Sequence, residues 1–250
     1  MSETGMEIDD IEVYGFRHAL TDMRNPKESW DKSDSKFEGS SPYYPPYLGE
    51  ASVPRRPAPW DVGRVTVLEF PYIGPDDMKL ALNLIKGGGA HRKFLREIYV
   101  WWTITIPRAL WQELDTYKVS TVRNSCSTMH KLGSRELVPA DFADEDVEPS
   151  VLFKLNDMGV CYRGKHAYVD ERTGKVYEGV PLLRHMKLQL PESYLQRAGY
   201  VFNYESALKM YYDRHDHRML EWSSADGICA HIRCLPYMNE FIEAAQTQRG

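Results

Sequence analysis

The sequence predicts an α+β fold. Residues 64–73 and 97–106 have the β-branched and aromatic composition of strands, and residues 74–89 and 107–118 have the apolar spacing and end signals of helices. Strands and helices are mixed, without the repeating strand–helix–strand units of an α/β fold. At 250 residues, 42% of them hydrophobic, the chain is long enough to bury a substantial core.

Residues 1–62 are predicted to form an extended N-terminal arm, and residues 63–250 a single α+β domain. The arm contains the runs NPKESWDKSDSKFEGSSPYYPPYLGE and ASVPRRPAPW, which are rich in Pro, Ser, Gly and charge. Such residues resist regular helices and central strands. The tyrosines and the tryptophan among these prolines suggest that the arm packs along a body or a neighbouring subunit.

Each element of the domain has its own local signal. RVTVLEFPYI (64–73) alternates like a strand, and GPDDMKLALNLIKGGG (74–89) has acids in its first turn and a glycine stop. EIYVWWTITI (97–106) predicts a strand covered on both faces, after which Pro107 opens a helix. A hairpin turning at 172–174 is expected within 160–180. One or two helices are expected within 191–222, and a short one within 235–245.

Charge and cysteine content narrow the function classes. A net charge of −5 argues against a protein that coats DNA, although a local basic patch is compatible with it. The four cysteines contain no CxxC pair, and Cys229, His231 and Cys234 lack standard zinc spacing, so no metal site is expected. With no signal-like start and no apolar run of about 18 residues, a cytoplasmic, non-membrane protein is expected.

One stretch, LWQELDTYKVSTVRNSCSTMHKL (110–132), is crowded with hydrogen-bond donors. Clustered hydroxyls, amides and cations suit the oxygens of a phosphate. The same side chains also suit an ordinary cap or turn, because Ser, Thr and Asn bond readily to nearby backbone. Both interpretations remain open at this point.

A second polar set follows residue 201. At helical spacing, one face would hold a polar stripe, for which a solvated outer surface is the simpler explanation. The stripe comprises Asn203, Ala207, Met210, Arg214, His217, Arg218 and Glu221.

The order of these features resembles the flavin-dependent thymidylate synthase family (ThyX, or thymidylate synthase complementing proteins) over residues 63–132 and 188–245. LNLIKGGGAHRKFLREIYVWWTI is similar to the family's helix, glycine, histidine and strand, and IPRALWQELDTYKVSTVRNSCSTMHKL to its helix and signature loop. LPESYLQRAGYVFNYESALKMYYDR and HRMLEW are similar to its late helical motifs.

The signature itself is eroded. The family's Arg-His-Arg corresponds to Thr116, Tyr117 and Lys118, and its motif serine to Thr121. The following run fits either Asn124 and Ser127, with one inserted residue, or Arg123, Asn124 and Cys126 without one. The family's phosphate-binding arginine falls at Glu205. Its late substrate-activating arginine falls at His231, with Arg233 close by.

The resemblance implies a ThyX-like mixed sheet with packed helices and an enzyme that makes dTMP. Such an enzyme transfers a one-carbon unit from methylenetetrahydrofolate to C5 of dUMP, with FAD as cofactor and NADPH as hydride source, in a homotetramer. The alternatives are a repurposed protein that binds nucleotide or nucleic acid without flavin catalysis, and a structural or interaction protein. By carry-over the catalytic residues are His231 and Arg233; the cofactor-binding residues are His91, Arg92, Thr116, Tyr117, Lys118, Thr121 and Asn203; the substrate-binding residues are Ser120, Arg123, Asn124, Ser125, Cys126, Ser127 and Arg214.

Overall fold

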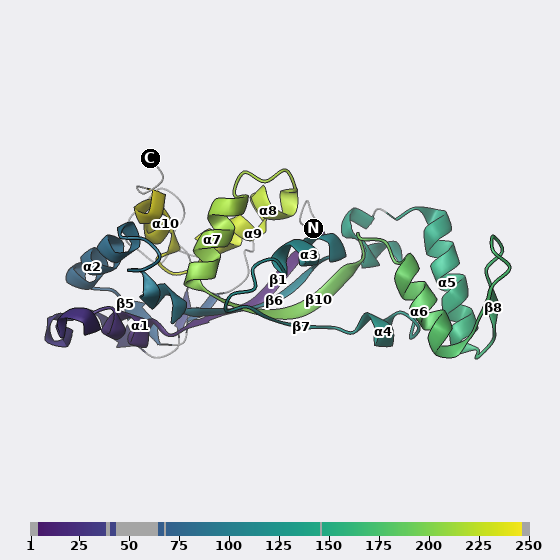
Figure 1. Cartoon of the computed structure of the whole chain (residues 1–250), viewed down its shortest axis with the longest axis horizontal. Helices are drawn as coiled ribbons and strands as arrows, with labels where there is room; N and C mark the ends of the chain where they lie inside the picture. The colour runs from purple at the N-terminus through teal and green to yellow at the C-terminus, as the bar shows by residue number, and fades with distance from the viewer. Residues whose placement is uncertain (1–4, 39–40, 44–64, 68, 146, 247–250) are drawn as a thin grey trace. The chain divides into compact units, whose positions relative to one another are not determined.

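The computed structural model describes residues 5–38, 41–43, 65–67, 69–145 and 147–246. They form an α+β fold with a six-stranded sheet in the order β3-β4-β1-β6-β10-β7 (Figure 1). β1 is parallel to β4, whereas β3 is antiparallel to it, so the sheet is mixed as predicted. Its strands are β1 (Glu7–Tyr14), β3 (Ser41–Tyr43), β4 (Val65–Val67), β6 (Tyr99–Pro107), β7 (Val122–Ser125) and β10 (Leu195–Asn203).

The remaining elements are helices and two small strand pairs. The pairs are β2 (Lys36–Glu38) with β5 (Phe70–Tyr72), and β8 (Tyr168–Val169) with β9 (Val176–Tyr177). The helices are α1 (Phe16–Asp22), α2 (Pro75–Lys86), α3 (Arg108–Leu114), α4 (Thr128–Lys131), α5 (Pro149–Arg163), α6 (Gly179–Gln189), α7 (Tyr204–Arg214), α8 (Leu220–Ser223), α9 (Ile228–Arg233) and α10 (Met238–Gln246). Within the part of the chain that the structure describes, none of these helices is long and apolar enough to cross a membrane.

The chain divides into two compact units, each with its own core. The first unit comprises Met1–Glu7, Thr105–Thr116 and Asn124–Ala198, and the second Ile8–Ile104, Tyr117–Arg123 and Gly199–Gly250. In the first unit α5 and α6 lie side by side over a core that includes Leu155, Leu182 and Met186 (Figure 1). In the second unit the largest buried side chains include Trp102, Phe202 and Phe241.

The prediction of an irregular arm is wrong for the start of the chain. β1 lies inside the sheet between β4 and β6, and α1 follows it. The strand was missed because its buried residues Ile8 and Ile11 are three apart. Asp10, with φ of 45°, shifts the alternation by one residue between them. The boundary expected near residue 62 falls outside the described residues and stays a prediction.

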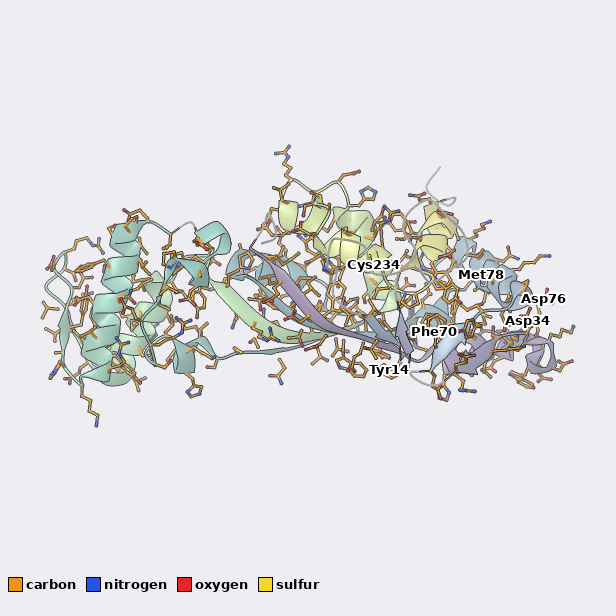
Figure 2. The ribbon with its side chains drawn as sticks, turned by 180° about the vertical axis from the view of Figure 1, so that it is seen from behind. Tyr14, Asp34, Phe70, Asp76, Met78 and Cys234 are labelled. Atoms are coloured by element: carbon orange, nitrogen blue, oxygen red, sulfur yellow. The ribbon has the colours of Figure 1, made fainter. Side chains whose placement is uncertain are left out.

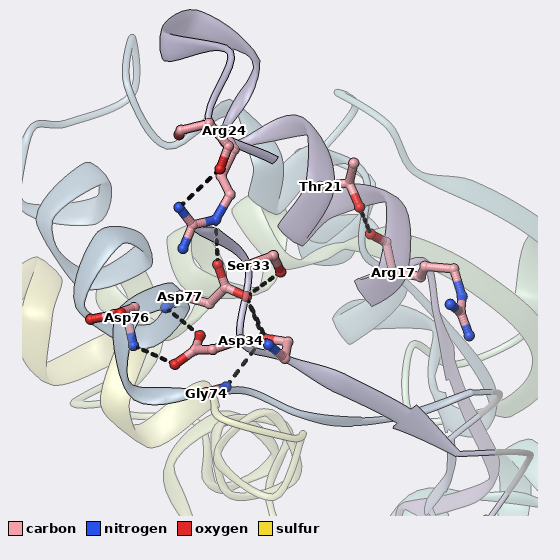
Figure 3. Close-up of polar contacts among 10 residues, drawn as sticks. Arg17, Thr21, Arg24, Ser33, Asp34, Gly74, Asp76 and Asp77 are labelled. Carbon is pink, nitrogen blue, oxygen red and sulfur yellow. Dashed lines mark hydrogen bonds and ion pairs between the residues drawn. The ribbon is translucent and has the colours of Figure 1, made fainter. Parts of the chain in front are cut away.

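The chain after α1 is tied to α2 by a buried ion pair. Arg24 Nε donates to Asp77 Oδ1 at 2.6 Å, and both side chains are almost fully buried. The hydroxyls of Ser33 and Ser35 donate to Asp77 Oδ2 at 2.7 and 2.6 Å (Figure 3). The carboxylate therefore has a partner on each oxygen, as a buried charge requires.

Asp34 supplies the missing cap at the beginning of α2. Its two carboxylate oxygens accept hydrogen bonds from the backbone N–H groups of Asp76 and Asp77, at 2.9 and 3.0 Å (Figure 3). Figure 2 shows Asp34 next to Asp76. These N–H groups have no partner within the helix, so a side chain from a distant segment completes it.

Of the early predictions, the helix at 74–89 and the strand at 97–106 are confirmed as α2 and β6. The strand predicted at 64–73 is two strands in different sheets, because Glu69 has φ of 59° and separates them. Only one face of β6 is fully buried: Trp102 is enclosed, but Trp101 is 38% exposed. The expected coverage of both faces is therefore wrong at this position.

Later in the chain, the hairpin is confirmed as β8–β9, whereas residues 160–163 belong to α5. The region expected to be only helical begins with β10, where Ala198, Tyr200 and Phe202 alternate as buried residues. α7 ends at Arg214, so the continuous stripe is also wrong. Three of its residues, Asn203, Ala207 and Met210, are buried rather than solvated.

Candidate functional site

The donor-rich segment after α3 is mostly exposed. Tyr117 is buried, but Lys118, Ser120 and Arg123 face solvent. Ser120 has φ of 59°, which turns the chain into β7 at the end of the sheet. The segment therefore exposes two cationic side chains and one hydroxyl to solvent, while the buried side chain of Tyr117 anchors its beginning.

Two contacts join this segment to α7. Ser206 Oγ donates to the backbone oxygen of Val119 at 3.0 Å. Arg214 Nε donates to the hydroxyl of Tyr117 at 3.2 Å. Side chains almost one hundred residues apart in sequence thus meet within the second unit. Arg214, a predicted substrate-binding residue, thus lies beside Tyr117, a predicted cofactor-binding residue.

Aromatic and cationic side chains surround Tyr117. Its ring lies 6.2 Å from the ring of Trp222, and Arg214 Cζ is 5.2 Å above that tryptophan. Lys209 Nζ is 5.6 Å from the centre of the Tyr117 ring, at the distance of a cation–π contact. Burial raises the pKa of Tyr117, and the Arg214 hydrogen bond opposes this only in part. Tyr117 is therefore a neutral phenol near two cations.

Arg214 also contacts His217. Its Nη1 lies 2.8 Å from His217 Nε2, while the backbone N–H of Met219 donates to His217 Nδ1 at 3.2 Å. Neither His217, Lys209 nor Trp222 was singled out as a site residue from the sequence. The chain leaves the helical path after Arg214, so an extrapolated helix could not place His217 and Trp222 beside Tyr117. Lys209 lies within α7 but outside the polar stripe expected for this helix. Trp222 is the last residue of HRMLEW, which is similar to one of the family's late helical motifs, and that similarity could have pointed to it.

The glycines after α2 shape the position of His91. Gly88 has φ of 89°, and its carbonyl accepts from the backbone N–H of His91 at 2.8 Å. A Cβ at Gly87 would lie only 3.0 Å from the His91 ring. His91 is exposed, so its ring edge is accessible to a ligand.

Arg92 is held by Glu205. Arg92 Nε lies 3.2 and 3.0 Å from the two carboxylate oxygens, and Nη2 lies 3.0 Å from Oε1. The fork that could grip a phosphate is thereby occupied by a carboxylate of the same chain. Arg92 is available to a ligand only if this pair opens.

Three other predicted site residues have local structural partners. Asn203 is buried; its Oδ1 accepts from the backbone of Ser206 at 2.9 Å and caps α7. Thr116 Oγ1 donates to the backbone oxygen of Glu113 at 2.7 Å, and Thr121 Oγ1 to that of Tyr117. For these side chains the structure favours the ordinary cap and turn interpretation.

The two candidate catalytic residues differ in character. His231 is buried, with Nδ1 2.9 Å from the backbone oxygen of Gly227, and burial lowers its pKa. A neutral ring whose Nδ1–H donates to that carbonyl has no hydrogen on Nε2. Arg233 is half-buried at the end of α9, and its Nε donates to Asn239 Oδ1 at 3.0 Å.

The rest of the predicted substrate loop lies in the first unit. The backbone N–H of Cys126 donates to Arg197 O at 2.9 Å, and Gln196 Nε2 donates to Cys126 O at 2.8 Å. Ser127 precedes α4 without a side-chain cap. Asn124, Cys126 and Ser127 are exposed, while Ser125 is half-buried. The loop thus divides between the two units after Arg123.

Cys229 and Cys234 offer no reactive thiolate. Burial raises the pKa of Cys229 to about 12 and that of Cys234 to about 11. Among the residues that the structure describes, no group of three His, Cys, Asp or Glu side chains could hold a metal ion.

Comparison with solved structures shows where this fold is found. It is similar to thymidylate synthase X (ThyX) from Helicobacter pylori with FAD and dUMP: TM-score 0.57, 14% identity, 96% of this chain and 99% of that chain covered. A second structure, of the flavin-dependent thymidylate synthase ThyX from the same organism complexed with FAD and dUMP, gives TM-score 0.52 and 14% identity, with 97% and 93% covered. The fold is ThyX-like. No protein-family model and no curated protein matches the sequence.

Proposed function

We propose that this protein is a flavin-dependent thymidylate synthase-like enzyme that transfers a one-carbon unit from methylenetetrahydrofolate to C5 of dUMP. FAD would be its cofactor, NADPH its hydride source, and a cytoplasmic homotetramer its working form. The observation that carries the proposal is the contact of Arg214 with Tyr117, which joins the donor-rich segment to α7. Support comes from the likeness of the fold to ThyX structures that contain FAD and dUMP.

The exposed donors of this site fit phosphate groups. Lys118 and Arg123 supply cationic side chains, and Ser120 supplies a hydroxyl near them in sequence. His91 and Tyr117 would contact the flavin, and Lys118 would neutralise its phosphates. Bound FAD would supply the redox chemistry, which no side chain of the protein provides. The residues of this chain would bind and orient the nucleotide.

Arg233 is the better candidate for stabilising charge on the pyrimidine. A guanidinium stays protonated and donates from several N–H groups, whereas the His231 ring is neutral and lacks a donor at Nε2. We therefore assign carbonyl polarisation to Arg233 and a packing role to His231. Arg214 would orient Tyr117 and supply charge beside the nucleotide.

Titration of the purified protein with FAD tests the cofactor, and a dTMP assay tests the reaction. The protein should perturb the visible spectrum of FAD and, with dUMP, NADPH and methylenetetrahydrofolate, should form dTMP. Lys118→Gln should weaken FAD binding, whereas Lys36→Gln, at an exposed lysine on β2, should leave it unchanged. A spectrum unaltered by the protein, together with no dTMP, would remove the enzyme proposal.

A second candidate is a protein that binds the nucleotide without flavin chemistry. The pairing of Arg92 with Glu205 favours it, since that pair withdraws one cation from any bound cofactor. In that case dUMP should bind to the colourless protein, and FAD should not compete. Calorimetry with dUMP in the presence and absence of FAD separates the two candidates.

A further inference from the structure

Residues 163–187 differ in charge from the rest of the chain. They carry six Lys and Arg against three Asp and Glu, a net charge of +3, in a protein of net charge −5. The remaining sequence therefore carries −8. The six cations are Arg163, Lys165, Arg172, Lys175, Arg184 and Lys187. Segregation of charge on this scale marks a surface that attracts anions.

These six side chains are all exposed. Within the described residues, the structure gives none of them a side-chain hydrogen bond or an ion pair. The acid Asp170, by contrast, is buried, and its Oδ1 accepts from the backbone and hydroxyl of Thr173, both at 3.0 Å. Its Oδ2 lies 3.5 Å from Lys154 Nζ and 3.7 Å from His185 Nε2. One of the three acids is thus buried and paired, so the six exposed cations of this segment outnumber its two exposed acids, Glu171 and Glu178.

The β8–β9 hairpin explains how this surface is presented. Tyr168 and Tyr177 pair on one face, where Tyr168 is buried and Tyr177 stacks on His185 at 4.1 Å. Val169 and Val176 pair on the other face and are 53% and 63% exposed. The inner face anchors the hairpin to the core of the first unit. The outer face and the turn are left open.

An exposed aromatic ring lies in the same region. Phe153 on α5 is 76% exposed, the largest value among the exposed large hydrophobic residues described in this unit. Its neighbour Lys154 reaches Asp170, which is the first residue of the hairpin turn. Phe153 therefore immediately precedes the residue whose side chain links α5 to the turn that carries Arg172 and Lys175. We name Phe153, Arg172 and Lys175 the hairpin surface.

We propose that the hairpin surface binds single-stranded nucleic acid. Arg172 and Lys175 would contact backbone phosphates, and a base would stack on Phe153, the combination used by proteins that bind single strands without sequence preference. Leu182, Leu183 and Met186 of α6 are buried in the unit's own core. The exposed apolar residues of this helix, Val180 and Leu188, are separated by Arg184 on the same side, so α6 presents no continuous apolar face to a lipid surface. This site is separate from the one proposed for the nucleotide substrate.

Binding of a fluorescent 20-nucleotide oligo(dT) to the full chain, measured by anisotropy at several salt concentrations, tests the inference. Arg172→Gln with Lys175→Gln should raise Kd at least tenfold and reduce the slope of log K against log salt by about 1.4. Phe153→Ala should raise Kd at least fivefold at every salt concentration without changing that slope, because stacking is not ionic.

Lys32→Gln with Lys79→Gln is the matched control. It removes the same charge from exposed lysines of the second unit and should change Kd less than twofold. An equal loss in this control would mean that net charge alone drives binding. Wild-type protein that ignores the oligonucleotide at low salt, or that binds phosphatidylserine vesicles instead, would also overturn the inference. Circular dichroism of each variant would confirm that it is folded.

Discussion

The guanidinium of Arg92 and the carboxylate of Glu205 form a two-pronged ion pair in which Nε and Nη2 each lie 3.0 Å from a carboxylate oxygen. Each side chain is about one-fifth exposed, so the pair is neither free in solvent nor sealed in the core. Glu205 lies in the first turn of α7, where a helix favours negative charge. The pair joins the glycine-rich turn to the helix that reaches Tyr117.

Glu205→Gln tests whether the ion pair with Glu205 keeps the guanidinium of Arg92 from binding a ligand. A neutral amide no longer balances the charge of Arg92, so the guanidinium becomes available to the cofactor and FAD affinity should rise several-fold. Isothermal titration calorimetry measures the change. The cost in folding free energy should be small, on the order of 1 kcal/mol or less, because the pair is partly solvated. If FAD affinity is unchanged in this variant, the role of Arg92 is confined to the scaffold.

Arg123→Ala tests the donor-rich segment itself. Arg123 is exposed on β7, and a charge-assisted contact with phosphate should disappear with its side chain. The affinity for dUMP should fall more than tenfold, which corresponds to about 1.4 kcal/mol. Arg17→Ala, at an exposed arginine of α1, is the control and should bind dUMP like the wild type. Equal affinities for the two folded variants would count against the assignment.

The elements that the sequence predicted well are those with a complete local signal. α2 has proline at its first position, acids in the first turn and glycine after the last, and β6 is β-branched and aromatic almost throughout. β1 was missed because one left-handed residue, Asp10, breaks its period. β10 was missed because it runs directly into α7. The helical spacing of the α7 residues led to a helical prediction for the whole segment.

The candidate site was predictable only where residue type decides the role. The exposed cations and hydroxyl of Lys118, Ser120 and Arg123 follow from composition, since such side chains favour solvent. The partners of Arg92 and Tyr117 do not, because each lies about one hundred residues away in sequence. No local pattern encodes a contact that only the folded sheet brings together.

His231 should make stability depend on pH. Burial lowers the pKa of His231 in the folded protein, whereas in the unfolded chain the pKa of a histidine is about 6.5. Below about 6.5 the unfolded chain therefore binds more protons, and stability falls as pH decreases toward the folded-state pKa. Urea unfolding at pH 7.5 and 5.5 should show this loss in the wild type, and His231→Gln should reduce it.

His130→Gln controls for a general effect of losing a histidine. His130 is exposed, so this variant should show the wild-type loss of stability between the two pH values. Should His231→Gln fail to fold, NMR titration of the His231 ring in the wild type gives the same information. A ring that takes up its proton at pH 6.5 or above would disprove the neutral state from which the role of Arg233 is argued.

The Arg24–Asp77 pair should control stability at lower pH. Burial by itself raises the pKa of Asp77, but hydrogen bonds from Ser35, Ser33 and Arg24 together outweigh it and leave the pKa below its usual value. The carboxylate thus contributes stability that is complete above the unfolded pKa of about 3.9 and is lost as pH falls through the folded value. Acid unfolding followed by circular dichroism measures this loss.

Asp77→Asn should lower the free energy of unfolding at pH 7 by about 3–5 kcal/mol, because it leaves the buried guanidinium of Arg24 without its counter-charge. Asp76→Asn, one position earlier on the exposed side of α2, is the matched control and should cost about 1 kcal/mol or less. Urea unfolding compares the two. Similar losses in both variants would show that the cost comes from the charge at the helix terminus, and that the buried pair stabilises the fold no more than an exposed carboxylate does.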